Sequence, residues 1–203
     1  MCNPGNPFLE RLGIRPEVQS FFKSSLNIAC ESLIFKYGNS LEHAGPGFHR
    51  IPVTEELWTA GEFALARHIF ICGSAMDAIS WLHFHHHAYH TQNFFFAAVG
   101  ASPCKNQIES LLRPGKQYHL VFSNDQLGAI CDLKVASFIR KKPLKIIAHE
   151  HQYIVTFKSK NYRLVHLSLN ALEKAARFHF NIPVSKPKQF NTYFEQLKHG
   201  HSN

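Results

Sequence analysis

Alternation of buried strands with helices along residues 68–148 constrains the fold of this chain more than any other feature of its sequence. Residues 68–72 form a continuous apolar run, which is the pattern of a strand covered on both faces. The apolar spacing that follows predicts a helix over 75–86. Strand and helix patterns then alternate to the end of the segment. The further strands are predicted at 94–99, 118–122 and 144–148, and the further helices at 102–112 and 126–140.

Such alternation implies a parallel sheet with right-handed crossovers. We therefore expect an α/β fold with a core of four largely parallel strands flanked by helices, over residues 65–148. Residues 1–64 carry short helix patterns and the strand pattern SLIFKY at 32–37, and they predict an α+β lead-in. Residues 149–203 predict a basic extension, in which a hairpin at 153–167 is followed by helices.

The composition is that of a globular chain, because 45% of its 203 residues are hydrophobic and this length is sufficient to bury a core. No segment reaches the roughly 18–20 uncharged apolar residues that a membrane span needs. The first residues also lack the basic start and apolar run of a secretory signal, so we expect no membrane association and a cytoplasmic location. The five cysteines include no C-x-x-C pair, and neither a disulfide framework nor a structural zinc site is predicted.

The net charge of +8 is unevenly distributed. Residues 1–133 hold 9 Lys and Arg against 11 Asp and Glu, whereas residues 134–203 hold 13 against 3. A basic segment of this kind suits a polyanionic partner such as nucleic acid. The alternative is a solvated basic surface that aids solubility and binds nothing.

Two carboxylates follow predicted strands of the core. Asp77 lies about one helical turn after the strand at 68–72, and Asp125 directly follows the strand at 118–122. Ligands of open parallel sheets bind at the carboxyl ends of the strands, and two carboxylates there could hold Mg²⁺, which prefers oxygen ligands. Alternatively, Asp77 faces the dipole of its helix and Asp125 caps the following helix.

Both carboxylates lie in segments that resemble the motifs of the Toprim domain. Residues 71–80, ICGSAMDAIS, resemble its first motif, in which a strand ends in Glu-Gly-x-x-Asp-Ala, and residues 120–128, LVFSNDQLG, resemble its second motif, Asp-x-Asp-x-x-Gly. The tail KPKQFN at 186–191 resembles the Lys-Asp-Trp-Asn element that follows Toprim in primase-like proteins of mobile elements. The similarity covers about residues 65–148 and implies a Toprim-like core. The family also includes bacterial primases, topoisomerases and recombination nucleases.

The chain departs from the Toprim pattern at catalytic positions. Gly73 occupies the position of the family's glutamate, which is thought to act in proton transfer, and Ser123 occupies that of the first aspartate of the second motif. Neither a glycine nor a serine replaces such a general acid/base or metal ligand. The resemblance therefore implies a catalytically degenerate protein without a cofactor. The alternative is a divergent Mg²⁺-dependent nuclease or nucleotidyl transferase that uses Asp77 and Asp125.

A degenerate Toprim-like protein could still bind nucleic acid through basic side chains. The resemblance favours DNA, in replication or in the processing of mobile elements, with a replication or mobilisation protein as a possible partner. Aromatic residues alternate with basic ones at 153–163, which suits single-stranded nucleic acid, although aromatic residues of a hairpin can equally form its core face. The candidate phosphate contacts are Arg140, Lys141, Lys142, Lys158, Lys160 and Arg163.

Two further hypotheses follow from the sequence. Histidines gather at the end of the helix predicted at 75–86, and their i, i+4 spacing can share a metal ion. Histidines near a helix C-terminus are also favoured without a metal when they are protonated. The third hypothesis for the function is a protein-interaction module with no nucleic-acid role. The clustered histidines are His83, His85, His86, His87 and His90.

Overall fold

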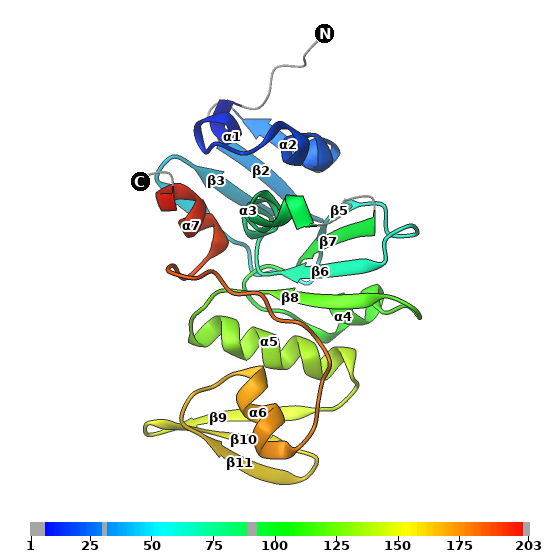
Figure 1. Cartoon of the computed structure of the whole chain (residues 1–203), viewed down its shortest axis with the longest axis vertical. Coiled ribbons are helices and arrows are strands. Elements are labelled where there is room, and N and C mark those ends of the chain that lie inside the picture. Colours follow the sequence, from blue (N-terminus) through cyan, green and yellow to red (C-terminus); the bar gives the residue numbers. More distant parts are fainter. Residues whose placement is uncertain (1–6, 30–31, 89–92, 201–203) are drawn as a thin grey trace.

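The computed structural model describes residues 7–29, 32–88 and 93–200, and it has a mixed α/β architecture with three β-sheets arranged along the long axis of the molecule (Figure 1). Within these ranges, every helix is too short or too polar to cross a membrane. The predicted α/β class is therefore confirmed at this coarse level, and the sheets differ in how their strands pair.

The first sheet is an antiparallel meander in the order β1-β2-β3-β4. The predicted strand SLIFKY is β2, and its alternate residues Leu33, Phe35 and Tyr37 are fully buried on the inner face. Two short helices, each with a proline in its first turn, precede the sheet. The elements are α1 (Pro7–Arg11), α2 (Pro16–Phe22), the 3₁₀ helix η1 (Lys23–Ser25), β1 (Asn27–Ala29), β2 (Ser32–Tyr37), β3 (Ser40–Gly45) and β4 (Phe48–Arg50).

The central sheet has the order β5-β7-β6-β8, in which β7, β6 and β8 are parallel and β5 is an antiparallel edge strand. Every residue of β7 is buried, as the continuous apolar runs of the sequence predict for strands covered on both faces. Three of the four predicted parallel strands are thus confirmed. The strands are β5 (Trp58–Gly61), β6 (His68–Cys72), β7 (Phe94–Ala98) and β8 (Gln117–Val121).

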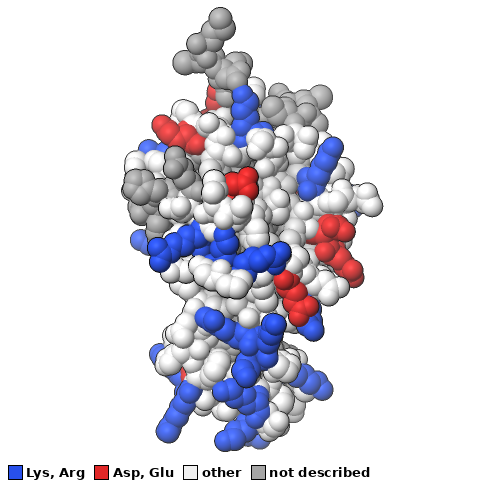
Figure 2. Space-filling view, turned by 90° about the vertical axis from the view of Figure 1, so that its right-hand side faces the viewer, with Lys and Arg blue, Asp and Glu red and all other residues white. Residues whose placement is uncertain are grey.

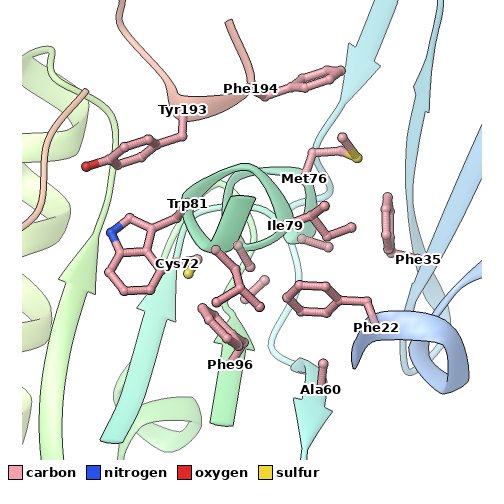
Figure 3. Close-up of a cluster of buried hydrophobic side chains, with 14 of the residues drawn as sticks. Phe22, Phe35, Ala60, Cys72, Met76, Ile79, Trp81, Phe96, Tyr193 and Phe194 are labelled. Atoms are coloured by element: carbon pink, nitrogen blue, oxygen red, sulfur yellow. The ribbon is translucent and has the colours of Figure 1, made fainter. Parts of the chain in front are cut away.

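Helices cover both faces of the central sheet and divide the interior into two cores. On one face, α3 packs against the first sheet and the C-terminal helix α7, around residues such as Phe22, Phe96 and Phe194 (Figure 3). On the other face, α4 and α5 pack over Ile69 and Ile71. The helices are α3 (Ala75–His85), which continues into η2 (His86–Ala88), α4 (Lys105–Leu111), α5 (Gln126–Ile139) and α7 (Tyr193–Gly200).

The prediction of a fourth parallel core strand at 144–148 is wrong. This segment is β9 (Leu144–His149), which pairs antiparallel with β10 (Gln152–Phe157) in a separate sheet that β11 (Lys160–Leu164) completes. The physical reason is burial: Lys145, Ile147 and the end of β9 are exposed, and a strand with one open face suits an antiparallel sheet. The helix α6 (Leu169–Ala176) packs on this sheet beside the predicted hairpin, which is confirmed.

The chain then returns from the third sheet to the central one. This return segment, residues 181–192, forms a single parallel bridge through Val184 to Leu120 on the outer edge of β8. It ends at α7, which packs on α3 at the opposite end of the molecule from α6 (Figure 1). The return segment therefore partly occupies the free edge of β8, where a further parallel strand could have joined the sheet.

A buried glutamate joins the first sheet to the central core. Glu42 on β3 is 0% exposed, and its carboxylate accepts hydrogen bonds from the backbone N–H groups of Ala75 (2.8 Å) and Met76 (3.1 Å) in the first turn of α3. The Tyr37 hydroxyl donates to the same carboxylate at 2.5 Å, and His49 Nε2 lies 2.9 Å from its other oxygen. Glu42 therefore fills the anion-binding position at the N-terminus of α3.

Replacing Glu42 with alanine should lower the free energy of unfolding by about 3–5 kcal/mol, because it leaves buried donors of α3 and Tyr37 without an acceptor. Urea denaturation of the two proteins measures this difference. Replacing the exposed Glu55 with alanine is the matched control and should change the value by less than about 0.5 kcal/mol. A loss of less than about 1 kcal/mol for the Glu42 variant would contradict the role given to this carboxylate.

Candidate nucleic-acid interface

The first Toprim-like motif forms the junction between β6 and α3. Ser74 is the N-cap of α3, and its hydroxyl both accepts from the Asp77 N–H and donates to Asp77 Oδ2 at 2.8 Å. The other oxygen of Asp77 accepts the backbone N–H of Phe194, the second residue of α7, at 3.1 Å. Burial raises the pKa of Asp77, which is 5% exposed. Asp77 thus connects α3 to the C-terminal helix.

The second motif forms the junction between β8 and α5. Asp125 is the N-cap of α5, and its Oδ1 accepts the Gly128 N–H and the Ser123 hydroxyl, each at 2.7 Å. The predicted capping role of Asp125 is therefore confirmed. Gly128 lies so close to this turn that a Cβ atom there would be 1.9 Å from the Ser123 carbonyl oxygen, which requires glycine at this position.

A lysine of the return segment reaches the end of β8. Lys186 Nζ donates to the carbonyl oxygens of Phe122 (3.2 Å) and Ser123 (2.8 Å) and forms an ion pair with Asp132 Oδ2 at 2.6 Å. Nearby, the Asn124 N–H donates to the Asn191 carbonyl. The tail that resembles the Lys-Asp-Trp-Asn element thus lies against the second motif. The Asp132–Lys186 pair was not predicted, although that tail resemblance was the signal that could have indicated it.

Asp132 is a buried carboxylate on α5 with one free oxygen. Its side chain is 4% exposed, and Oδ1 has no hydrogen-bond partner. Burial raises the pKa of Asp132 to about 6, while the neighbouring Lys186 ammonium opposes this rise. The carboxyl therefore titrates within two units of neutral pH.

Three of the clustered histidines, His83, His85 and His86, form hydrogen bonds within the fold. His83 is buried and its Nδ1 accepts the Arg15 N–H, whereas His85 Nδ1 bonds the Trp81 carbonyl and His86 Nδ1 bonds the His83 carbonyl. Among the described residues, no group of three or more His, Cys, Asp or Glu side chains is placed to hold a metal ion. His90 lies outside the described residues.

Two of the predicted phosphate contacts have intramolecular partners. Arg140 donates from Nε to the Phe180 carbonyl and from Nη2 to the Asn181 carbonyl, and so holds the start of the return segment. Lys158 Nζ lies 4.0 Å from the centre of the Phe178 ring, in a cation–π contact. Both side chains remain exposed, but their charges are partly used in holding the fold.

Lys141 and Lys142 line a cleft that a third lysine completes. The cleft has a volume of about 360 Å³ and lies between α4 and the turn from α5 to β9. Lys105, the first residue of α4, lines its other side, and all three lysines are exposed. The acidic residue in the lining, Glu109, forms an exposed ion pair with Lys105 at 3.5 Å. Lys105 was not predicted, because it lies 36 residues before Lys141 and only the packing of α4 beside α5 brings them together.

The two remaining candidates, Lys160 and Arg163, lie on the third sheet. Arg163 on β11 faces Ile154 across the ladder and lies on the open face of the sheet. Lys145 on β9, which was not among the candidates, faces Thr156 and lies on the same face. Lys160 pairs with the buried Phe157 and lies at the edge of the opposite, covered face. Alternation along the strands thus separates the predicted contacts between the two faces.

The aromatic residues of the hairpin share the covered face. Phe157 is fully buried, and Tyr162 packs against the same core. Their interpretation as the core face of the hairpin is therefore confirmed. Tyr153 is half-buried and lines a cleft next to α5, so its ring differs from the other two in having an open side.

Basic side chains outnumber acidic ones in the C-terminal lobe, which we define as residues 140–180. The lobe holds nine Lys and Arg against two acidic residues, Glu150 and Glu173. Figure 2 shows Lys and Arg side chains gathered over the lower part of the molecule, whereas Asp and Glu lie mostly on its upper part. The nine are Arg140, Lys141, Lys142, Lys145, Lys158, Lys160, Arg163, Lys174 and Arg177.

Neither models of known protein families nor curated proteins match this sequence.

Asp132 should make stability depend on pH. Because the folded-state pKa of about 6 lies above the ordinary value of 3.8, the stabilising contribution is present at low pH and is lost as the pH rises through about 6. Relative to Asp132→Asn, the wild-type protein should lose up to about 3 kcal/mol of unfolding free energy between pH 4 and 7. Urea denaturation at several pH values tests this. In the Lys186→Met variant, the loss of stability should occur at a higher pH. If the difference in unfolding free energy between the wild-type protein and Asp132→Asn stays constant with pH, the raised pKa of Asp132 is refuted.

Proposed function

We propose that this chain is a catalytically degenerate Toprim-like protein that binds nucleic acid, with DNA as the favoured partner, in replication or the processing of mobile elements. The observation that carries the proposal is the cleft lined by Lys105, Lys141 and Lys142, which lies at the border of the basic C-terminal lobe. Lysines from two separate elements meet there. The acidic residue of the lining, Glu109, pairs with Lys105, whereas Lys141 and Lys142 are exposed cations. Such a surface attracts the phosphates of a polyanion without a metal ion.

The proposal gives Asp77 and Asp125 structural roles. Asp77 is buried and both of its oxygens accept hydrogen bonds, from Ser74 and Phe194. Asp125 caps α5, and the Ser123 hydroxyl donates to it where the Toprim pattern has a second carboxylate. Gly73 provides no side chain at the position of the family's glutamate. These contacts favour a binding protein over a Mg²⁺-dependent nuclease or nucleotidyl transferase.

The open face of the third sheet extends the same surface. Lys145 and Arg163 lie on this face on either side of β10, where Lys145 pairs with Thr156 and Arg163 pairs with Ile154. Their partners across the ladder are uncharged, so the two cations are free of local acidic neighbours on this face. We expect them to contribute phosphate contacts in addition to those of the lysine cleft.

Reversing the charge of both Lys141 and Lys142, as Lys141→Glu with Lys142→Glu, should weaken DNA binding by about tenfold or more at low salt. Removing two phosphate contacts should also flatten the slope of log affinity against log salt by about 1.4–1.8. Fluorescence anisotropy with labelled single- and double-stranded DNA at several salt concentrations measures both quantities. The matched control is Lys36→Glu with Arg50→Glu, which changes the net charge equally on exposed strands of the first sheet.

The alternatives give different outcomes in the same experiment. Binding that is lost in EDTA, together with DNA turnover that Asp125→Asn abolishes, would support the Mg²⁺-dependent enzyme. No binding even at low salt would reject a nucleic-acid role and favour the protein-interaction module. An equal loss of affinity in the control variant would mean that overall charge, and not the lysine cleft, is responsible for binding.

A further inference from the structure

A second and larger cleft, of about 710 Å³, lies at the carboxyl end of β8. It is enclosed by the first turns of α5 and α6, by the loop between β11 and α6, and by the return segment. The volume is within the range of about 300–1,000 Å³ that is typical of ligand sites. Ligands of open α/β sheets also bind at this end of the strands, and Glu42 already occupies the corresponding position beside α3.

The lining of the cleft combines apolar walls with one aromatic ring. Val165, Leu167 and Ile182 form apolar parts of the wall, and Ala129 contributes from α5. Tyr153 is half-buried on β10 and lines the cleft from the third sheet. An apolar slot with an accessible aromatic ring suits a flat, uncharged ring system such as a nucleobase.

The polar part of the lining is acidic, although the surrounding lobe is basic. Asp125, Asp132 and Glu173 line the cleft, and Lys186 is the one lysine or arginine among the lining residues that the structure describes. Its ammonium already donates to three oxygen atoms. This lining disfavours a phosphate and favours a ligand that donates hydrogen bonds.

A buried acceptor without a partner indicates the same kind of ligand. Asp132 lines the cleft, its side chain is 96% buried, and Oδ1 forms no hydrogen bond with any residue that the structure describes. A buried carboxylate oxygen raises the free energy of the folded protein unless a hydrogen-bond donor reaches it. At the mouth, Asp125 uses Oδ1 to cap α5, which leaves Oδ2 for a donor. Asp125, Ala129 and Asp132 follow one another on the same side of α5, so both carboxylates face one cleft.

We propose that this cleft binds a guanine base, with the ring against Tyr153 and its Watson–Crick edge toward the carboxylates. Guanine presents two adjacent donors on that edge, the ring N1–H and the exocyclic amino group, whereas the other bases place an acceptor beside each donor. Asp132 Oδ1 and Asp125 Oδ2, the one oxygen of each carboxylate that the contacts above leave over, give two acceptors for this pair. The inference rests on the proposed function for a base that belongs to a nucleic-acid strand, but a free guanine nucleotide would make the same contacts.

Nucleosides without a phosphate test the cleft separately from the basic surface. Calorimetric titration and ligand-observed NMR would compare guanosine with adenosine, cytidine and thymidine on the full-length protein. We expect guanosine to bind at least about tenfold more tightly than each of the others, which corresponds to about 1.4 kcal/mol. Binding of the nucleoside should also be nearly independent of salt, because no phosphate is involved.

Three variants assign the contacts. Asp125→Asn keeps a good N-cap for α5 but replaces one acceptor oxygen with a donor, and it should reduce the preference for guanosine by about tenfold or more. Tyr153→Leu removes the ring and should weaken guanosine binding. Glu55→Gln, at an exposed residue outside both clefts, is the control and should leave nucleoside binding unchanged. Thermal unfolding of each variant verifies that it is folded.

The outcomes separate this inference from the proposed function. If no nucleoside binds, or if all four bind equally and Asp125→Asn changes nothing, the guanine site is refuted, while salt-dependent DNA binding can still hold. If guanosine binds but DNA does not, the guanine site stands with a free nucleotide as its ligand, and the proposed binding of nucleic-acid strands is rejected. If both bind, oligonucleotides containing guanine should bind more tightly than matched oligonucleotides without it.

Discussion

The carboxylate of Glu42 at the N-terminus of α3 is the interaction on which the arrangement of this molecule depends. The first turn of that helix points two N–H groups toward the end of β6, where open α/β sheets commonly bind anions. Here the anion is a side chain of the preceding sheet. Glu42 therefore holds that sheet on the central core through a buried, hydrogen-bonded contact, and it occupies the anion-binding position at the start of α3.

The residues of both Toprim-like motifs likewise form hydrogen bonds with other parts of the chain. Asp77 accepts a hydrogen bond from α7, and the end of β8 accepts two from Lys186, so these polar groups at the strand ends bind other parts of the chain. Asp77, which would hold metal or substrate in an enzyme, instead connects α3 to Phe194, more than a hundred residues further along the chain. Lys186 connects the return segment to the end of β8, more than sixty residues earlier. Because these residues make contacts within the fold, the proposed binding surface lies at the C-terminal lobe instead.

The order of strands and helices from β6 to α5 could be predicted because it depends on local periodicity and turn residues. The partner of β9 could not, because the run Leu144–His149 is apolar enough for a core strand and only its pairing with β10 shows which face is open. Asp125 as an N-cap was predictable from its place before a helix. Glu42, Lys105 and Lys186 were missed for one reason: each acts through residues that are more than thirty positions away in the sequence.

The distribution of charge around α5 connects the two clefts that we propose as binding surfaces. At its C-terminus, Lys141 and Lys142 are placed where the helix dipole favours cations, and they line the basic cleft with Lys105. On the side of its first turns, Asp125 and Asp132 line the acidic cleft. A nucleotide is complementary to this arrangement, because its anionic phosphate suits the basic cleft and its neutral base donates hydrogen bonds to the acidic cleft. A strand that lies along α5 would therefore have its phosphates attracted to one end of this helix and a base accepted near the other. The opposite orientation would place a phosphate beside the carboxylates of Asp125 and Asp132.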